Sequence, residues 1–273
     1  MSSRVGTPPP APEPLAADLF DSHCHLDAMG CRERADVAVA VAAAQAVGVR
    51  RVVTVGDTVD SSRWCAEAAA AHPDVFAAVA IHPNEAAGVD DASYDQLRAL
   101  ALRPQVRAIG ETGLDYYWGR VDPGVQQEVF RWHIALAKEV GKPLVIHDRD
   151  AHGDVLRILH DEGAPPWTIF HCFSGDADMA RLCTARGYVL SFAGTLTFKN
   201  AQALREAARV VPAERLLVET DAPFLAPMPY RGRPNAPYLV PFTARVLAEI
   251  KGIHIEQLCE TITRTGELAF GPW

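Results

Sequence analysis

The chain has 273 residues, of which 49% are hydrophobic and 22% charged, a globular composition that can form a sizeable core. Its 26 Lys and Arg against 34 Asp and Glu give a formal net charge of −8, which argues against a basic face coating duplex DNA or an anionic membrane. The length fits one α/β barrel of about 250 residues and is short for two ordinary domains.

The N-terminus is rich in proline: residues 1–17 hold five of the chain's 20 prolines and few large apolar side chains. This composition predicts a disordered extension over 1–17, followed by a single domain over 18–273. The six cysteines are scattered without a CxxC pair, which is typical of reduced thiols in the cytoplasm. No secretory signal and no apolar run of about 20 residues is visible, so we expect a soluble cytoplasmic chain without membrane contact.

From Asp18 onward, short blocks rich in Val, Ile, Leu, Phe or Ala alternate with helical stretches. Such blocks are typical of strands that are buried on both faces of a parallel sheet. The eight predicted strands are 18–23, 50–56, 76–82, 106–111, 143–148, 167–172, 187–193 and 215–221. Their alternation with helices predicts an α/β fold, a (β/α)8 TIM barrel in a single domain, with an open doubly wound sheet as the alternative.

The clearest predicted helix is 122–141. Asp122 can cap its start, Pro123 suits its first position and Gly141 suits its end. Apolar residues recur every three or four positions between them and form one stripe, so we expect one face of this helix to be buried.

Histidines gather where the strands of such a barrel carry their working groups, at the C-terminal ends. Five of the ten histidines lie at a strand end or in the turn after it: His23, His25, His82, His147 and His171. Four others, in predicted helices or their flanks, are assigned structural roles: His72, His133, His160 and His254.

The first predicted strand places Asp21, His23 and His25 on one face, because side chains alternate along a strand. If the barrel closes, the eighth strand neighbours the first. Asp221, at the end of the eighth strand, then lies beside the two imidazoles. The sequence thus predicts a three-ligand metal site with room for water.

Three more ligands end consecutive strands: Glu111, His147 and His171. Mixed imidazole and carboxylate sites suit Zn²⁺, Mn²⁺ or Fe²⁺. Two ions about 3.5–4 Å apart can share a carboxylate and lower the pKa of a water molecule. Glu111, between the two clusters, is the predicted bridge.

Seven motifs follow one another across nearly the whole domain. They are FDSHCHLD (20–27), AIHPNEA (80–86), AIGETGLDYYW (108–118), VIHDRD (145–150), IFHCFSG (169–175), SFAGTLTFKNA (191–201) and VETDAPFLAPMPYRGRPN (218–235). In this order and spacing, the chain resembles the TatD family of metal-dependent deoxyribonucleases, within the amidohydrolase-type metal barrels.

The resemblance implies the same six metal ligands: His23, His25, Glu111, His147, His171 and Asp221. It also implies hydrolysis of DNA phosphodiesters, usually with Mg²⁺, by 3′→5′ exonuclease or endonuclease action, and a part in DNA repair. Two positions depart from the family pattern. Asn84 stands where many relatives carry His, which puts substrate contacts near the third strand in doubt. Arg264 stands where relatives often have Asn, which affects only the local cap of the last helix.

Our mechanistic hypothesis is hydrolysis assisted by two divalent ions, Mg²⁺, Mn²⁺ or Zn²⁺. Glu111 and Asp221 are the predicted catalytic carboxylates, with Asp221 also accepting the proton of the attacking water. Asp21 and Glu219 either orient ligands or anchor the barrel by buried hydrogen bonds.

Substrate contacts are predicted around the barrel mouth, because guanidinium groups match the geometry of phosphate. The candidates are His82, Arg149, Arg231 and Arg233, with Lys199 a weaker one. The aromatic residues 116–118 either stack a nucleobase or pack on the rim. We expect the partner to be the end of a single DNA strand and the protein to be a monomer.

Two other functions stay open. Another binuclear metallohydrolase of this superfamily would act on a small ester, amide, phosphoester or aminoacyl-tRNA. Many such enzymes bridge their metals with a carboxylated lysine, but none of the four lysines ends a predicted strand and Glu111 occupies the bridging place. A non-catalytic, partner-binding barrel should have lost a ligand, and none of the six is missing.

Overall fold

The computed structural model describes residues 6–272, and within them eight parallel strands pair in chain order. They are β1 (Leu19–Cys24), β2 (Val49–Val55), β3 (Val75–Val79), β4 (Val106–Asp115), β5 (Leu144–Arg149), β6 (Thr168–Phe170), β7 (Val189–Phe192) and β8 (Leu216–Val218). A bridge between Cys24 and Ala222 joins the end of β1 to the loop after β8, and His25 N–H donates to the Ala222 carbonyl at 2.7 Å. The sheet is therefore a nearly closed barrel, which confirms the predicted (β/α)8 TIM barrel in a single domain.

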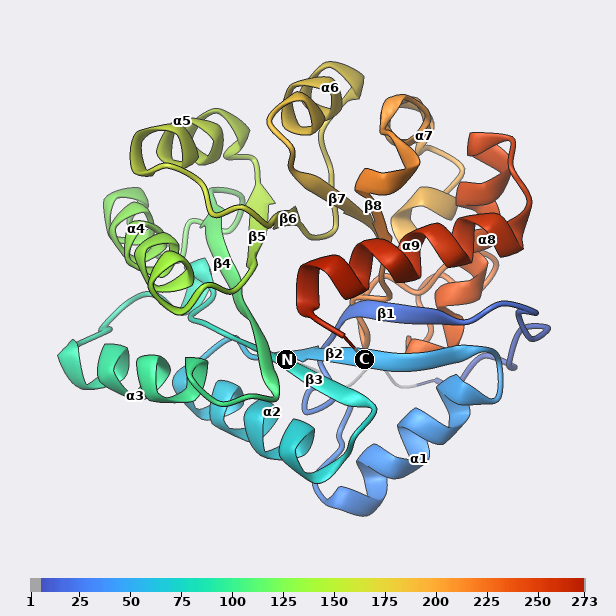
Figure 1. The fold of residues 1–273 in the computed structure, drawn as a ribbon, viewed down its shortest axis with the longest axis horizontal. Coiled ribbons are helices and arrows are strands. Elements are labelled where there is room, and N and C mark those ends of the chain that lie inside the picture. Colours follow the sequence, from blue (N-terminus) through green and yellow to red (C-terminus); the bar gives the residue numbers. More distant parts are fainter. Residues whose placement is uncertain (1–5, 273) are drawn as a thin grey trace.

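Helices surround the strands (Figure 1). The α-helices of the described residues are α1 (Arg34–Gln45), α2 (Val59–Ala71), α3 (Asp91–Ala101), α4 (Pro123–Val140), α5 (His152–Glu162), α6 (Ala177–Ala185), α7 (Gln202–Val210), α8 (Val240–Lys251) and α9 (Ile255–Phe270). All residues of β1, β3 and β7 are buried, as expected for strands that carry side chains into the barrel and against the helices. None of the helices in this part of the chain is long and apolar enough to cross a bilayer.

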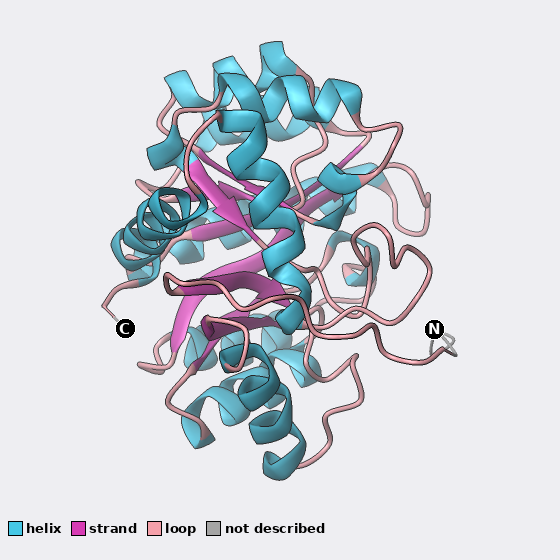
Figure 2. Ribbon diagram, turned by 90° about the vertical axis from the view of Figure 1, so that its right-hand side faces the viewer, coloured by secondary structure: helices cyan, strands magenta, loops and turns pink. Residues whose placement is uncertain are grey.

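Helix α9 packs against the N-terminal end of the barrel. Phe270 meets Phe20 of β1 edge to face, with 6.2 Å between ring centroids, and its carbonyl accepts from Arg107 at the start of β4. In Figure 2, long loops and the N-terminal segment lie toward the opposite end from the C-terminus. Because α9 covers the N-terminal end of the barrel, we look for the functional groups at the other end, where the strands finish.

Helix α4 begins and ends as its sequence predicts. Asp122 accepts from the Gly124 N–H at 2.8 Å, Pro123 is the first helical residue, and Gly141 takes the left-handed conformation with φ 64°. A residue with a side chain would be strained at this φ, whereas glycine is not.

Strand β4 is longer than predicted. It continues past Glu111, the last residue of the predicted strand, to Asp115. Gly113 belongs in the strand because β4 closely approaches β5: a Cβ there would lie 2.1 Å from the His147 carbonyl oxygen. Glu111 is thus inside β4, and Asp115 is the carboxylate at its end. Strand β8, in contrast, is shorter than predicted. It ends at Val218, so Asp221 lies in the following loop.

The N-terminal segment differs from the predicted disorder where it is described; residues 1–5 lie outside the described part. Pro9, Pro12 and Leu15 are buried. A spacing of three places them on one face of an extended, polyproline-like chain. The carbonyls of this segment accept hydrogen bonds from three side chains of the barrel: Thr7 and Pro8 from Arg233, Pro9 from Tyr238 and Glu13 from Arg245. The composition of residues 1–17 does not reveal this spacing of three.

Candidate metal centre

Glu111 lies between two groups of side chains at the mouth of the barrel. Its Oε1 is 3.7 Å from Nε2 of His23 and 3.4 Å from Nε2 of His25. Oδ1 of Asp221 is 3.5 Å from the same nitrogen of His25. This first group, His23, His25 and Asp221, is the one that strand alternation and barrel closure predict.

The other oxygen of Glu111 faces the second group. Oε2 lies 2.7 Å from Nε2 of His171 and 3.1 Å from Nδ1 of His147. The two imidazoles are close to each other as well, with 3.4 Å between these nitrogens. The structure therefore brings all six predicted ligands together, with one carboxylate in contact with both groups.

The buried carboxylates of the cluster need positive charge beside them. Burial alone would raise the pKa of Glu111, but the charge of His171 and hydrogen bonds from His147 and His171 hold it well below its usual range. Burial alone would lower the pKa of His171, yet the carboxylates Glu111 and Glu219 raise it well above its usual range. His25 has its pKa raised in the same way, against burial, by Asp57, Asp221 and Glu111. Without cations, protons on these imidazoles balance the carboxylates.

The second nitrogens of three imidazoles are held outside the cluster. Nδ1 of His25 donates to the Val55 carbonyl at 2.9 Å, and Nδ1 of His171 to Oε1 of Glu219 at 3.2 Å. Nε2 of His147 lies 3.2 Å from Oδ2 of Asp115. Metal-binding histidines are typically oriented in this way. The donor atoms that remain, imidazole nitrogens and carboxylate oxygens, fit divalent ions such as Zn²⁺ and Mn²⁺.

Two carboxylates near the cluster are not among the predicted site residues. Asp57 lies two residues after the end of β2, and its Oδ1 lies 3.5 Å from Nδ1 of His25. Asp115 contacts His147 and accepts a second bond, from Nδ2 of Asn84, at 2.8 Å. Asp57 has the same signal as the predicted ligands, an acidic residue just after a strand. Asp115 can be recognised as an acidic residue at a strand end only when β4 is known to reach that residue.

Glu219 and Asp21 are both fully buried and play different structural parts. Glu219 orients His171 and also accepts from the backbone N–H of Cys172 at 2.7 Å. Asp21 accepts from the N–H and hydroxyl of Thr220, at 2.9 and 2.5 Å, and so joins β1 to the residue before Asp221. Its burial raises the pKa of the Asp21 carboxyl to about 8.

The four predicted substrate contacts are not equivalent. The ring of His82 lies 4.4 Å from that of His147, while its Nδ1 accepts from the Asn84 N–H at 3.0 Å. Arg149 and Arg231 are exposed and stack on aromatic rings. Arg233, in contrast, is bound to the carbonyls of the N-terminal segment. Of the three predicted arginines, the structure thus leaves Arg149 and Arg231 available to a substrate.

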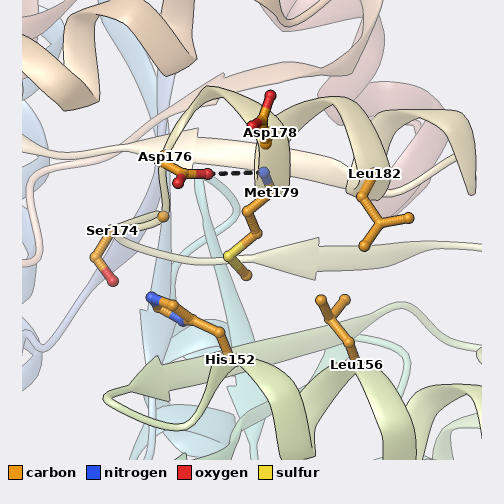
Figure 3. A pocket seen from close by; sticks show the side chains of 8 residues that line it. His152, Leu156, Ser174, Asp176, Asp178, Met179 and Leu182 are labelled. Atoms are coloured by element: carbon orange, nitrogen blue, oxygen red, sulfur yellow. Dashed lines mark hydrogen bonds between the residues drawn. The ribbon is translucent and has the colours of Figure 1, made fainter.

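Two grooves border the mouth of the barrel. The larger, about 530 Å³, lies between α5 and α6, and Figure 3 shows Leu156, Met179 and Leu182 around it. Asp176, which caps α6 through the Met179 N–H at 2.9 Å, and Asp178 make it unfavourable for phosphate. The smaller groove, about 350 Å³, is lined by Cys172 and Phe198. Because Cys172 follows His171, this smaller groove adjoins the metal ligands.

Comparison with known proteins gives concordant matches. The model of a family described as TatD-related DNase matches residues 20–271. The chain is 49% identical to the uncharacterized metal-dependent hydrolase TatD of Mycobacterium tuberculosis, over 93% of this chain and 98% of that protein. It is 40% identical to the uncharacterized metal-dependent hydrolase YabD of Bacillus subtilis, over 92% and 98%. The crystal structure of YjjV, a TatD homolog from Escherichia coli, superposes with a TM-score of 0.86 at 27% identity, covering 92% of this chain and 97% of that one.

Proposed function

Because this chain belongs to the TatD-related DNase family of metal-dependent hydrolases, we propose that it hydrolyses DNA phosphodiester bonds, as a 3′→5′ exonuclease on single-stranded ends. The observation that carries this proposal is the position of Glu111, whose two oxygens face the two groups of predicted ligands. A carboxylate placed in this way suits a pair of divalent ions, and paired ions are typical of enzymes that cleave phosphodiesters.

Two divalent ions would be held by the side chains already described. His23, His25 and Asp221 would bind one, His147 and His171 the other, and Glu111 both. When bound, such ions polarise a phosphoryl oxygen and lower the pKa of the attacking water. Their identity is a proposal as well: the ligands accept Mg²⁺, Mn²⁺ or Zn²⁺.

Asp221 is suited to accept the proton of the attacking water. Its side chain is 13% exposed, against 5% for Glu111, so it is the more accessible of the two carboxylates. Burial would raise the pKa of Asp221, but the hydrogen bond with His25 and the charge of His171 lower it below the usual range. The carboxylate is therefore ionised at neutral pH, which is the form that a proton acceptor must have.

Exposed arginines supply positive charge near the mouth. Arg149 ends β5, two residues after His147, so both side chains lie on the same face of the strand. Within residues 6–272, neither Arg149 nor Arg231 has a carboxylate within 4 Å, which leaves both guanidinium groups available for phosphate. A few such contacts can hold a strand end in a protein of net charge −8.

The test is hydrolysis of single-stranded DNA, labelled at the 3′ or the 5′ end, by protein stripped of metal and then refilled. We expect stepwise shortening from the 3′ end, absent without metal and in Asp221→Asn. Asp178→Asn, the same change at a residue whose side chain is 91% exposed on α6, should keep wild-type activity. Turnover of a small ester, phosphotriester or aminoacyl-tRNA without any cleavage of DNA would overturn the nuclease proposal in favour of another metallohydrolase.

A further inference from the structure

Four exposed side chains next to the metal centre form an aromatic and cationic cluster. Tyr117 and Trp118, in the turn after β4, are 55% and 51% exposed, and their rings meet edge to face with 5.0 Å between centroids. The Arg149 guanidinium lies 3.9 Å from the Tyr117 ring centroid and 5.4 Å from that of Trp118. Arg120 lies 5.2 Å from the Trp118 ring. We name Tyr117, Trp118, Arg120 and Arg149 the rim cluster.

The rim cluster is fixed relative to the predicted metal ligands. Oδ1 of Asp115 accepts from the backbone N–H groups of Tyr117 and Trp118, at 3.0 and 3.2 Å. Oδ2 of the same carboxylate lies 3.2 Å from Nε2 of His147. The backbone of Tyr116 also pairs with β5, since its N–H donates to the Arg149 carbonyl at 3.0 Å. One buried carboxylate thus positions both an imidazole of the metal centre and the turn that carries the two aromatic rings.

Both guanidinium groups of the rim cluster lack an acidic partner in the described part of the chain. Other surface arginines are paired, for example Arg157 with Asp154 at 2.8 Å and Arg181 with Asp178 at 2.7 Å. The rim cluster therefore offers flat apolar rings and unpaired positive charge side by side.

This combination suits a ligand that carries a flat ring and a negative group on the same chain. Nucleobases stack on exposed aromatic rings and on guanidinium planes, while phosphates pair with arginine. The faces of a base are accessible only when the strand is unpaired, because in a duplex they are covered by their neighbours.

We propose that the rim cluster is a subsite for an unpaired nucleobase of the strand whose phosphodiester lies at the metal centre. The base stacks on the Trp118 ring, and Arg149 pairs with a phosphate of the same strand. This subsite rests on the proposed nuclease function and deepens it, because it gives the enzyme a physical reason to select single-stranded ends.

Binding of a labelled single-stranded oligonucleotide to the metal-loaded protein tests the subsite, with phosphorothioate linkages to slow hydrolysis and fluorescence anisotropy as the readout. One lost stacking contact should weaken binding about tenfold in Trp118→Ala, and Trp118→Phe should restore most of the affinity. Leu268→Ala, at a residue 62% exposed on α9, is the matched control and should bind as wild type does. A strand of the same length with abasic sugars should bind wild type and Trp118→Ala equally weakly.

Hydrolysis of the ordinary and the abasic strand separates the subsite from the nuclease function. We expect Trp118→Ala to lose about tenfold in kcat/KM on the ordinary strand and nothing on the abasic one. Equal binding and hydrolysis of both strands by wild type and Trp118→Ala would overturn the subsite and leave the nuclease standing. If wild type hydrolyses neither strand, the nuclease proposal fails, while the anisotropy comparison still decides whether a base binds the rim cluster.

Discussion

Oδ2 of Asp115 lies 3.2 Å from Nε2 of His147, on the side of the imidazole opposite Glu111. Burial would raise the pKa of Asp115, but hydrogen bonds from His147 and Asn84 outweigh burial and lower it to about 2. The carboxylate is thus ionised, and it holds the proton of His147 on Nε2. Nδ1, which faces Glu111 and His171, is left free to bind a cation.

Asp115→Asn should weaken metal binding about 10- to 100-fold, because the amide no longer fixes the ring and tautomer of His147 as a carboxylate does. The measurement is the dissociation constant of Mn²⁺ or Zn²⁺ by competition with a chelator. Asp178→Asn, the same change on the exposed face of α6, serves as the control and should bind metal as wild type does. Equal affinity of Asp115→Asn and wild type would show that Asp115 does not position His147 for metal binding.

Metal binding at pH 7 should release protons. The pKa values of His25 and His171 are raised well above 6.5, so both imidazoles are protonated in the metal-free protein and must lose their protons to become ligands. Calorimetric titration in buffers of different ionisation enthalpy measures this release, which should be clear at pH 7 and diminish at higher pH. A binding enthalpy that is the same in every buffer would contradict it.

Alternation and barrel closure were sufficient to predict from the sequence that His23, His25 and Asp221 come together. His23 lies in β1 and His25 directly after it, two residues further on, and Asp221 reaches them because the chain after β8 neighbours the end of β1. Carboxylates that act through another side chain were harder to find. Asp115 was missed because the predicted strand ends at Glu111, and only the close approach of β4 to β5 shows that it continues.

The N-terminal segment shows that disorder cannot be predicted from composition alone. Few large apolar residues and many prolines predict disorder, yet a short run can be ordered when its apolar residues share one face. Pro9, Pro12 and Leu15 do so. The carbonyls of the segment also find donors in Arg233 and Tyr238, more than 220 residues away along the chain. Neither partner can be assigned before the fold is known.

Leu15 anchors this segment to the barrel. It is 9% exposed, and its N–H donates to the Val47 carbonyl at 3.0 Å. Leu15→Ala should lower the free energy of unfolding by about 2 kcal/mol, the lower end of the range for buried leucines, because the site lies at the edge of the core. Leu102→Ala, at a residue 68% exposed, should change it by less than about 0.5 kcal/mol. Urea unfolding of the two variants checks the difference, and equal stability would mean that the segment is not held by Leu15.

His133 should make stability depend on pH. It is fully buried on α4, where its Nε2 accepts from the Ile81 N–H at 3.1 Å and its Nδ1 donates to the Val129 carbonyl at 2.8 Å. Burial lowers its pKa to about 4, against about 6.5 in an unfolded chain. Between these values the unfolded chain binds more protons, so the stabilisation is complete above about pH 6.5 and is lost as the pH falls toward 4.

The measurement for His133 is urea unfolding of wild type and His133→Gln at several pH values. Glutamine cannot titrate, so the stability gap between the two proteins should narrow by about 2 kcal/mol from pH 7 to pH 5. The comparison removes the effect of other groups, which titrate in both proteins. A gap that stays constant over this range would contradict a neutral, buried His133.

The most direct test of the binuclear centre is the initial rate of hydrolysis of end-labelled single-stranded DNA as Mn²⁺ is added to metal-free protein. Since Glu111 faces both groups of ligands, we expect no activity without metal and a rate that rises until two equivalents are bound. Full activity in the metal-free protein, or a plateau at one equivalent, would contradict catalysis by a metal pair at this centre.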